Sequence, residues 1–123
     1  MATFEPWDIV KVPFPYTDRP VRERRPALVV ASNALEDRHG LLWVLMITSL
    51  ANRGWPEDVV VSDPASSGLP APSVVRTAKI ATIEVRETQK IGTLPIADRA
   101  EVAHHLSEAL AALTAAPPGL APF

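Results

Sequence analysis

The sequence contains no cysteine, which excludes disulfide bonds, thiolate catalysis and zinc sites built on cysteine. It also lacks a long hydrophobic run: residues 41–47 form the longest one, whereas a membrane-spanning helix needs about 20 such residues. The chain does not start with a basic segment that leads into an apolar stretch and a small-residue cleavage site. We therefore expect a cytoplasmic protein with no membrane partner.

A glycine-rich phosphate-binding loop is missing too, which argues against nucleotide hydrolysis. A large positive excess is also absent, because the net charge is −2 at pH 7 and proteins that coat nucleic acid usually carry many more cations. Arginines nevertheless cluster over residues 19–25, and the C-terminal third is acidic. This asymmetry favours a short single-stranded substrate held at one place. Genomic base composition is an alternative explanation for the number of arginines, but it does not explain their clustering.

The length of 123 residues fits one small domain with a single core. We expect the domain to span residues 1–116 and a flexible tail to span 117–123. Short apolar and β-branched runs alternate with segments rich in proline and glycine, and we predict strands at 7–12, 27–32, 41–48, 58–62, 73–76 and 79–83. This pattern is typical of a mainly β protein that forms a closed or nearly closed small barrel.

One helix is predicted near the C-terminus. Asp98 is placed to cap its start, and Glu101 follows three residues later as in a capping box. Apolar residues then recur at helical spacing up to Leu113, and the prolines after residue 116 end the pattern. We expect this helix to cover the barrel, and we expect Trp43, within an apolar strand, to lie in the core.

The segment 24–31 joins two arginines directly to an apolar strand. An arginine fixed at that point, such as Arg25, presents a planar fork that can hold two phosphate oxygens. The strand over 41–48 ends at Thr48 and Ser49, whose hydroxyls would lie beside Arg25 if the two strands pair. An arginine next to a hydroxyl is a minimal site for cleaving a phosphodiester. A solvated charge and a strand-ending threonine are the alternative interpretations.

Further blocks follow a fixed order along the chain. They include DIVKVPFPYTD at 8–18, RPALVV at 25–30, ITS at 47–49 and SVVR at 73–76, with shorter blocks at 68–69, 80–83 and 91–94. From about residue 7 to residue 113, this order resembles the MazF/PemK family of toxin endoribonucleases from bacterial type II toxin-antitoxin systems. The resemblance implies an SH3-like small β-barrel of the MazF/PemK/CcdB type with a C-terminal helix.

The resemblance also implies an activity and its residues. Arg25 matches the arginine of the Arg-Pro-x-Leu-Val motif, which is implicated in cleavage, and Thr48 matches the threonine of the Ile-Thr-Ser motif, which positions or stabilises the scissile phosphate. The implied function is an mRNA interferase, a sequence-specific and metal-independent endoribonuclease acting on single-stranded RNA. Attack by the RNA's own 2′-OH would leave 2′,3′-cyclic phosphate and 5′-OH ends. Neither a metal nor a cofactor is expected.

Other side chains are candidates for binding RNA, because single-strand readers combine cations with stacking surfaces. They are Arg19, Arg22, Arg24, Arg76, Ser49, Phe14 and Tyr16. Some family members carry a carboxylate two residues after the position of Arg76, where this chain has Ala78. That difference removes a possible acid or base and leaves Arg76 as a phosphate-binding candidate.

Partners are likewise implied by the resemblance. We expect a homodimer with RNA in a groove near the dimer interface, and a cognate antitoxin protein whose flexible, partly acidic segment competes for that groove. The alternative function is a non-catalytic toxin or binding module of the same fold, either a gyrase poison like CcdB or a degenerate member that only binds RNA.

Overall fold

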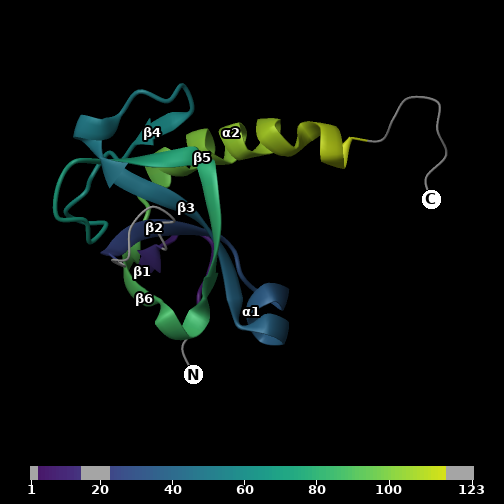
Figure 1. Cartoon of the computed structure of the whole chain (residues 1–123). Coiled ribbons are helices and arrows are strands. Elements are labelled where there is room, and N and C mark those ends of the chain that lie inside the picture. The colour runs from purple at the N-terminus through teal and green to yellow at the C-terminus, as the bar shows by residue number, and fades with distance from the viewer. Residues whose placement is uncertain (1–2, 15–22, 116–123) are drawn as a thin grey trace.

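The computed structural model describes residues 3–14 and 23–115. The predicted tail at 117–123 lies outside the described residues, as do the candidates Tyr16, Arg19 and Arg22. For Phe14 only the backbone is described. The elements, in chain order, are β1 (Asp8–Phe14), β2 (Glu23–Ala31), α1 (Ala34–His39), β3 (Leu41–Ser49), η1 (Leu50–Asn52), β4 (Asp58–Val60), β5 (Ser73–Glu84), η2 (Val85–Glu87), β6 (Gln89–Thr93) and α2 (Ile96–Thr114) (Figure 1).

The strands form one antiparallel sheet in the order β4-β5-β3-β2-β1-β6. The two strands predicted at 73–76 and 79–83 are a single strand, β5. Its register against β3 moves from Leu45 opposite Ile80 to Met46 opposite Arg76. The residues between these pairs form a bulge, and a bulge bends the strand that carries it. Figure 1 shows β5 turning in this way from the β4 side of the molecule toward η2.

The mainly β fold with a C-terminal helix is confirmed, although the described strands do not form a closed ladder. β4 and β6 are the two edges of the sheet. The loop after β4 packs against β6 at two glycines, Gly68 and Gly92, and a Cβ added to either one would overlap the backbone of the other segment. Gly68 also has a φ of +78°, which favours glycine. Close backbone packing therefore joins the loop after β4 to the edge strand β6.

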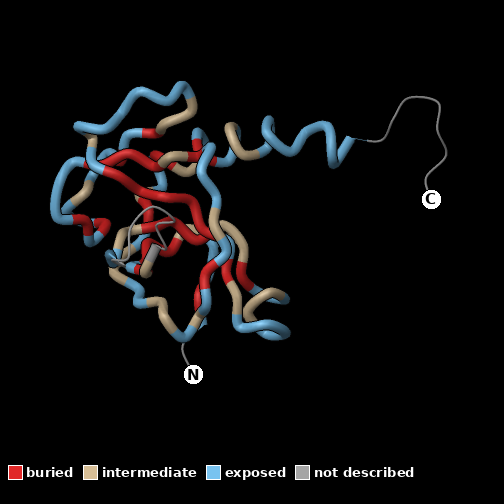
Figure 2. The backbone as a smooth tube through the Cα atoms, viewed as in Figure 1, coloured by how far each residue is buried: buried red, intermediate tan, exposed pale blue. Residues whose placement is uncertain are grey.

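Buried residues lie along the central strands (Figure 2). They form one cluster on each face of the sheet, which explains the nearly continuous apolar runs. Along β3, Leu42, Val44 and Met46 belong to one buried cluster, together with Val10, Val12, Ala27 and Val29. Leu45 and Ile47 point the other way and belong to a second cluster that includes Val102 of α2. We call these the inner cluster and the helix-side cluster. This alternation fixes which face each strand residue occupies.

The start of α2 differs from the prediction. The helix begins at Ile96, preceded by Pro95, and Asp98 does not cap it. The Asp98 carboxylate instead accepts hydrogen bonds from the backbone N–H and the hydroxyl of Ser62, at 2.9 and 3.0 Å. Because Asp98 is buried within the first turn, it anchors α2 to the chain that leaves β4. The sequence pattern predicted the helix, but the prediction that Asp98 caps it is wrong, because Asp98 bonds to Ser62 instead.

α2 covers less of the sheet than predicted. Val102 is buried and Leu106 is half-buried, whereas Leu110 and Leu113 are exposed. Figure 1 shows the C-terminal half of α2 extending beyond the sheet. No described helix is both long and apolar enough to cross a bilayer.

The prediction that Trp43 lies in the core is wrong, because 45% of this residue is exposed. Alternation along β3 puts Trp43 on the same face as Leu45 and Ile47, which are buried in the helix-side cluster. Trp43 lies nearer the start of the strand and is absent from that cluster. Its neighbours in a shallow surface hollow are Ile80, Ala81 and Thr82 of β5.

Candidate functional site

The two predicted catalytic residues lie on adjacent strands. β2 and β3 pair with Ala27 opposite Met46 and Val29 opposite Val44. Continuing this register toward the start of β2 places Arg25 across from Thr48. Since Ala27 and Met46 belong to the inner cluster, residues two positions further along share that face of the sheet. Arg25 and Thr48 therefore lie at the end of the inner cluster, where the buried surface meets solvent.

Arg25 and Thr48 have different surroundings. The Arg25 side chain is 27% exposed and has the Glu23 carboxylate 3.7 Å from its guanidinium. Thr48 is buried, and its hydroxyl oxygen accepts a hydrogen bond from Nδ2 of Asn52 at 3.0 Å. The site thus combines a partly exposed cation with a buried hydroxyl that already accepts one hydrogen bond.

The 3-10 turn η1 explains why Asn52 reaches Thr48. Ser49 caps this turn, and its hydroxyl oxygen accepts a hydrogen bond from the backbone N–H of Ala51 at 3.2 Å. The turn folds the chain back at once after β3, so that a residue four positions after Thr48 can contact it. Ser49 itself is exposed. Ser49, one of the two hydroxyl residues predicted to lie beside Arg25, therefore caps the turn that follows β3.

Arg24 is not on the face that carries Arg25, because successive residues of a strand point to opposite sides. Its guanidinium donates to the backbone carbonyls of Lys11 at 3.0 Å and Glu87 at 3.4 Å. Arg24 is exposed and links β2 to β1 and η2. The structure therefore separates the two neighbouring arginines.

The Arg76 guanidinium is bound by groups on β4 and η1. Its Nε and Nη2 donate to the two carboxylate oxygens of Asp58, at 3.2 and 3.0 Å, and Nη2 also donates to the carbonyl of Asn52 at 2.8 Å. The guanidinium lies 4.4 Å from the centroid of the Trp55 ring, within the range of a cation–π interaction. Only 11% of the Arg76 side chain is exposed. These contacts fasten the segment between η1 and β4 to β5.

Asp58 is the carboxylate whose pKa is clearly displaced. Burial raises the pKa of Asp58, but the hydrogen bonds from Arg76 and from the backbone N–H groups of Trp55 and Gly54 outweigh that effect, so the pKa lies below its ordinary value of 3.8. Asp58 is therefore ionised at neutral pH and pairs with a permanently charged guanidinium.

Sequence reasoning did not select Asn52 or Asp58 as site residues. The signal for Asp58 is its position opposite Arg76 in the pairing of β4 with β5, and that register is not visible in the sequence. The signal for Asn52 is its spacing of four residues from Thr48, which has meaning only once a turn follows β3 directly. Asn52 lies between predicted strands and Asp58 begins one, so both roles depend on the turn and the strand register that the folded chain adopts.

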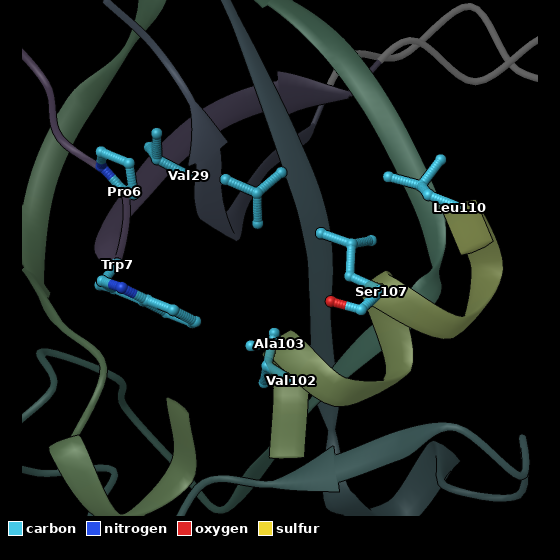
Figure 3. Close-up of a pocket in the computed structure, with 9 residues that line it drawn as sticks. Pro6, Trp7, Val29, Val102, Ala103, Ser107 and Leu110 are labelled. Carbon is cyan, nitrogen blue, oxygen red and sulfur yellow. The ribbon is translucent and has the colours of Figure 1, made fainter. Parts of the chain in front are cut away.

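A second surface feature lies on the opposite, helix-side face. An apolar groove of about 200 Å³ runs between α2 and the sheet and has no charged residue in its lining. Figure 3 shows Trp7 on one side of the groove and Val102, Ser107 and Leu110 of α2 on the other. Its chemistry suits contact with another apolar surface, whereas the polar groups lie with Arg25 and Thr48.

The curved antiparallel sheet with one C-terminal helix places the chain in the class of SH3-like small β-barrels. Within that class the chain belongs to the family described as PemK-like, MazF-like toxin of type II toxin-antitoxin system, whose model matches residues 5–110. A search of curated proteins found no match.

Solved structures agree with this assignment. A MazE-MazF complex from Deinococcus radiodurans is 26% identical, with 89% of this chain and 97% of that chain covered and a TM-score of 0.69. MazF from the same organism is 24% identical, with 90% and 99% covered and a TM-score of 0.71. An endoribonuclease in complex with its cognate antitoxin, from a mycobacterial species, is 19% identical, with 90% and 96% covered and a TM-score of 0.67. The last two similarities show the fold alone.

Proposed function

We propose that this chain is the toxin of a type II toxin-antitoxin pair and acts as a sequence-specific, metal-independent endoribonuclease on single-stranded RNA. The observation that supports the proposal is the register of β2 and β3, which pairs Ala27 with Met46 and, continued by two residues, brings Arg25 across from Thr48 at the solvent end of the inner cluster. Membership of the family supports the toxin role. The toxin domain would span residues 1–116, and the protein would act in the cytoplasm.

The proposed chemistry uses the nucleophile of the substrate. The 2′ oxygen of the RNA attacks the adjacent phosphorus, the bond from phosphorus to the 5′ oxygen breaks, and the products carry 2′,3′-cyclic phosphate and 5′-OH ends. The 2′-OH loses its proton and the departing 5′ oxygen gains one. Arg25 donates hydrogen bonds to the phosphoryl oxygens as charge develops, and Thr48 holds the same phosphate in line for attack.

We propose two protein partners. A cognate antitoxin with an acidic extended segment would bind near Arg25 and compete with RNA, since both ligands are anionic; a related structure contains a MazE-MazF complex. A second copy of the chain would cover the helix-side face, where exposed Leu110 lines the apolar groove and Leu113 is exposed beyond it on the same helix. Burial of such residues is the usual source of stability in a homodimer interface.

The test is cleavage of a long RNA by the purified protein, with and without excess EDTA, followed by primer extension to map the ends. We expect cuts within a short recurring motif, unchanged by EDTA, that carry 5′-OH ends. A 2′-deoxy substitution at the scissile nucleotide should abolish cleavage, because it removes the nucleophile. Intact RNA combined with arrest of gyrase-dependent supercoiling would contradict the proposal and establish the gyrase-poison alternative.

A further inference from the structure

The hydrogen bond between Asn52 and Thr48 limits the directions in which the threonine hydroxyl can donate. Asn52 donates from Nδ2 to Thr48 Oγ1 at 3.0 Å, so the oxygen acts as an acceptor in this contact. A hydroxyl has one proton to donate. Because Asn52 donates to this oxygen, the Thr48 proton points away from the amide nitrogen, toward other acceptors.

The backbone of Asn52 is held in place by Arg76. The backbone carbonyl of Asn52 accepts a 2.8 Å hydrogen bond from Arg76 Nη2, and the same guanidinium is paired with Asp58 at 3.0 Å. The Trp55 ring covers the guanidinium at 4.4 Å. A chain of contacts therefore runs from β4 and β5 through Arg76 and the backbone of Asn52 to the hydroxyl at the end of β3.

We propose that Asn52 is a positioning residue for the endoribonuclease reaction, acting through Thr48, and that the Asp58–Arg76 pair holds Asn52 in place. The inference rests on the proposed function, because it gives the Thr48 proton a phosphoryl oxygen as its acceptor. Arg76 then acts on the loop that carries Asn52 rather than on the substrate. This role needs no carboxylate at position 78, where the chain has alanine.

The rival role for Asn52 is direct contact with RNA, since the residue is exposed and amides commonly bind base edges. The two roles differ in what they change. A base contact supports binding of the RNA before cleavage, whereas orientation of the Thr48 hydroxyl supports the transition state. Measurements that separate kcat from RNA affinity therefore discriminate between them.

The experiment uses a short RNA that contains one cleavage site mapped on the long RNA. Cleavage is followed in single-turnover reactions, and affinity is measured by fluorescence anisotropy with the same oligonucleotide carrying a 2′-deoxy group at the scissile nucleotide. The variants are Asn52→Ala, which removes the amide, and Asn52→Gln, which keeps it on a longer side chain. Thermal unfolding of each variant confirms that it is folded.

We expect Asn52→Ala to reduce the cleavage rate constant by about tenfold, the equivalent of one well-placed hydrogen bond, with RNA affinity unchanged. Asn52→Gln should recover part of the rate. In a Thr48→Val background, Asn52→Ala should cost little more, because contacts that work through one another are not additive. These three results together support the positioning role.

Two results would overturn the inference while leaving the proposed function intact. One is wild-type cleavage by Asn52→Ala; the other is a loss of affinity that accounts for the whole loss of rate, which would make Asn52 an RNA ligand. Failure of the wild-type protein to cleave any RNA would instead refute the proposed function, and the inference with it. Arg25→Ala in the same assay separates these cases, since it tests the cleavage site without touching Asn52.

Discussion

Asp58 and Arg76 face each other across β4 and β5 and are joined at two points, with Nε to Oδ1 at 3.2 Å and Nη2 to Oδ2 at 3.0 Å. Their side chains are only 6% and 11% exposed. The pair occupies an edge of the sheet, since among the strands of the described residues β4 pairs with β5 alone. It therefore ties the edge strand, and the loop that leads into it, to the body of the protein.

Removing one member of this pair should destabilise the fold. We expect Asp58→Ala to lower the free energy of unfolding by about 2–4 kcal/mol, because the Arg76 guanidinium stays mostly buried without its partner. The matched control is Arg86→Ala, which removes an ion pair to Glu84 from a side chain that is 79% exposed and should cost less than about 1 kcal/mol. Urea unfolding measures both changes, and equal losses would mean that burial adds nothing to the pair.

The same pair should make stability depend on pH in acid. The pKa of Asp58 is lowered on folding, so its contribution to stability is complete above the unfolded pKa of about 4 and is lost as the pH falls through the folded pKa. The difference in unfolding free energy between the wild type and Asp58→Asn should therefore be larger at neutral pH than in strong acid. A constant difference across that range would show that the charge of Asp58 does not matter.

The pairing of β2 with β3, whose register points Arg25 toward Thr48, was predictable because each residue directly adjoins an apolar run and two such runs tend to pair. The network around Arg76 was not. Asn52 lies outside the predicted strands and Asp58 is the first residue of one, but their roles follow from a 3-10 turn and from the register of an edge strand of three residues. Hydrophobic periodicity carries no information about either.

Trp43 and Asp98 show a second limit of sequence reasoning. Both were assigned by type, a large aromatic residue to the core and an aspartate before an apolar run to a helix cap. In the folded chain, Trp43 lies outside the helix-side cluster, and Asp98 accepts hydrogen bonds from Ser62, 36 residues away. Contacts between segments distant in sequence override local preferences at both positions.

The two neighbouring arginines of β2 should differ in their effect on cleavage. Arg25→Ala should reduce cleavage of the mapped RNA by at least about a hundredfold, the scale of losing a donor that stabilises transition-state charge, and should remove toxicity while the protein stays folded. Arg24→Ala should leave the cleavage rate nearly unchanged, because its guanidinium lies on the other face and donates to backbone carbonyls. Cleavage rates measured at saturating RNA separate the two variants. Similar losses of rate would contradict the facial arrangement.

The contact between Gly68 and Gly92 should be essential to the fold. Gly92→Ala places a Cβ against the backbone at Ser67, which cannot move aside as a flexible side chain would, and we expect a loss of more than about 3 kcal/mol or failure to fold. Gly40→Ala is the control: nothing lies within 4 Å of its added Cβ, and its cost arises from a φ of +65° alone, about 1 kcal/mol. Thermal unfolding distinguishes the two, and equal midpoints would show that the loop and β6 can separate freely.

The exposed half of α2 leads to a prediction about assembly. If a second copy covers the helix-side face, a charge at Leu110, which lines the apolar groove (Figure 3), would be buried without a partner and should weaken the dimer. We expect the wild type to have the mass of a dimer in light scattering coupled to size-exclusion chromatography, and Leu110→Lys to shift toward the monomer at low micromolar concentration. Ile96→Lys is the matched control, because Ile96 is 80% exposed at the other end of the same helix and does not line the groove. A dimer that is unaffected by Leu110→Lys would place the interface elsewhere, and a monomeric wild type would leave the groove to a different partner.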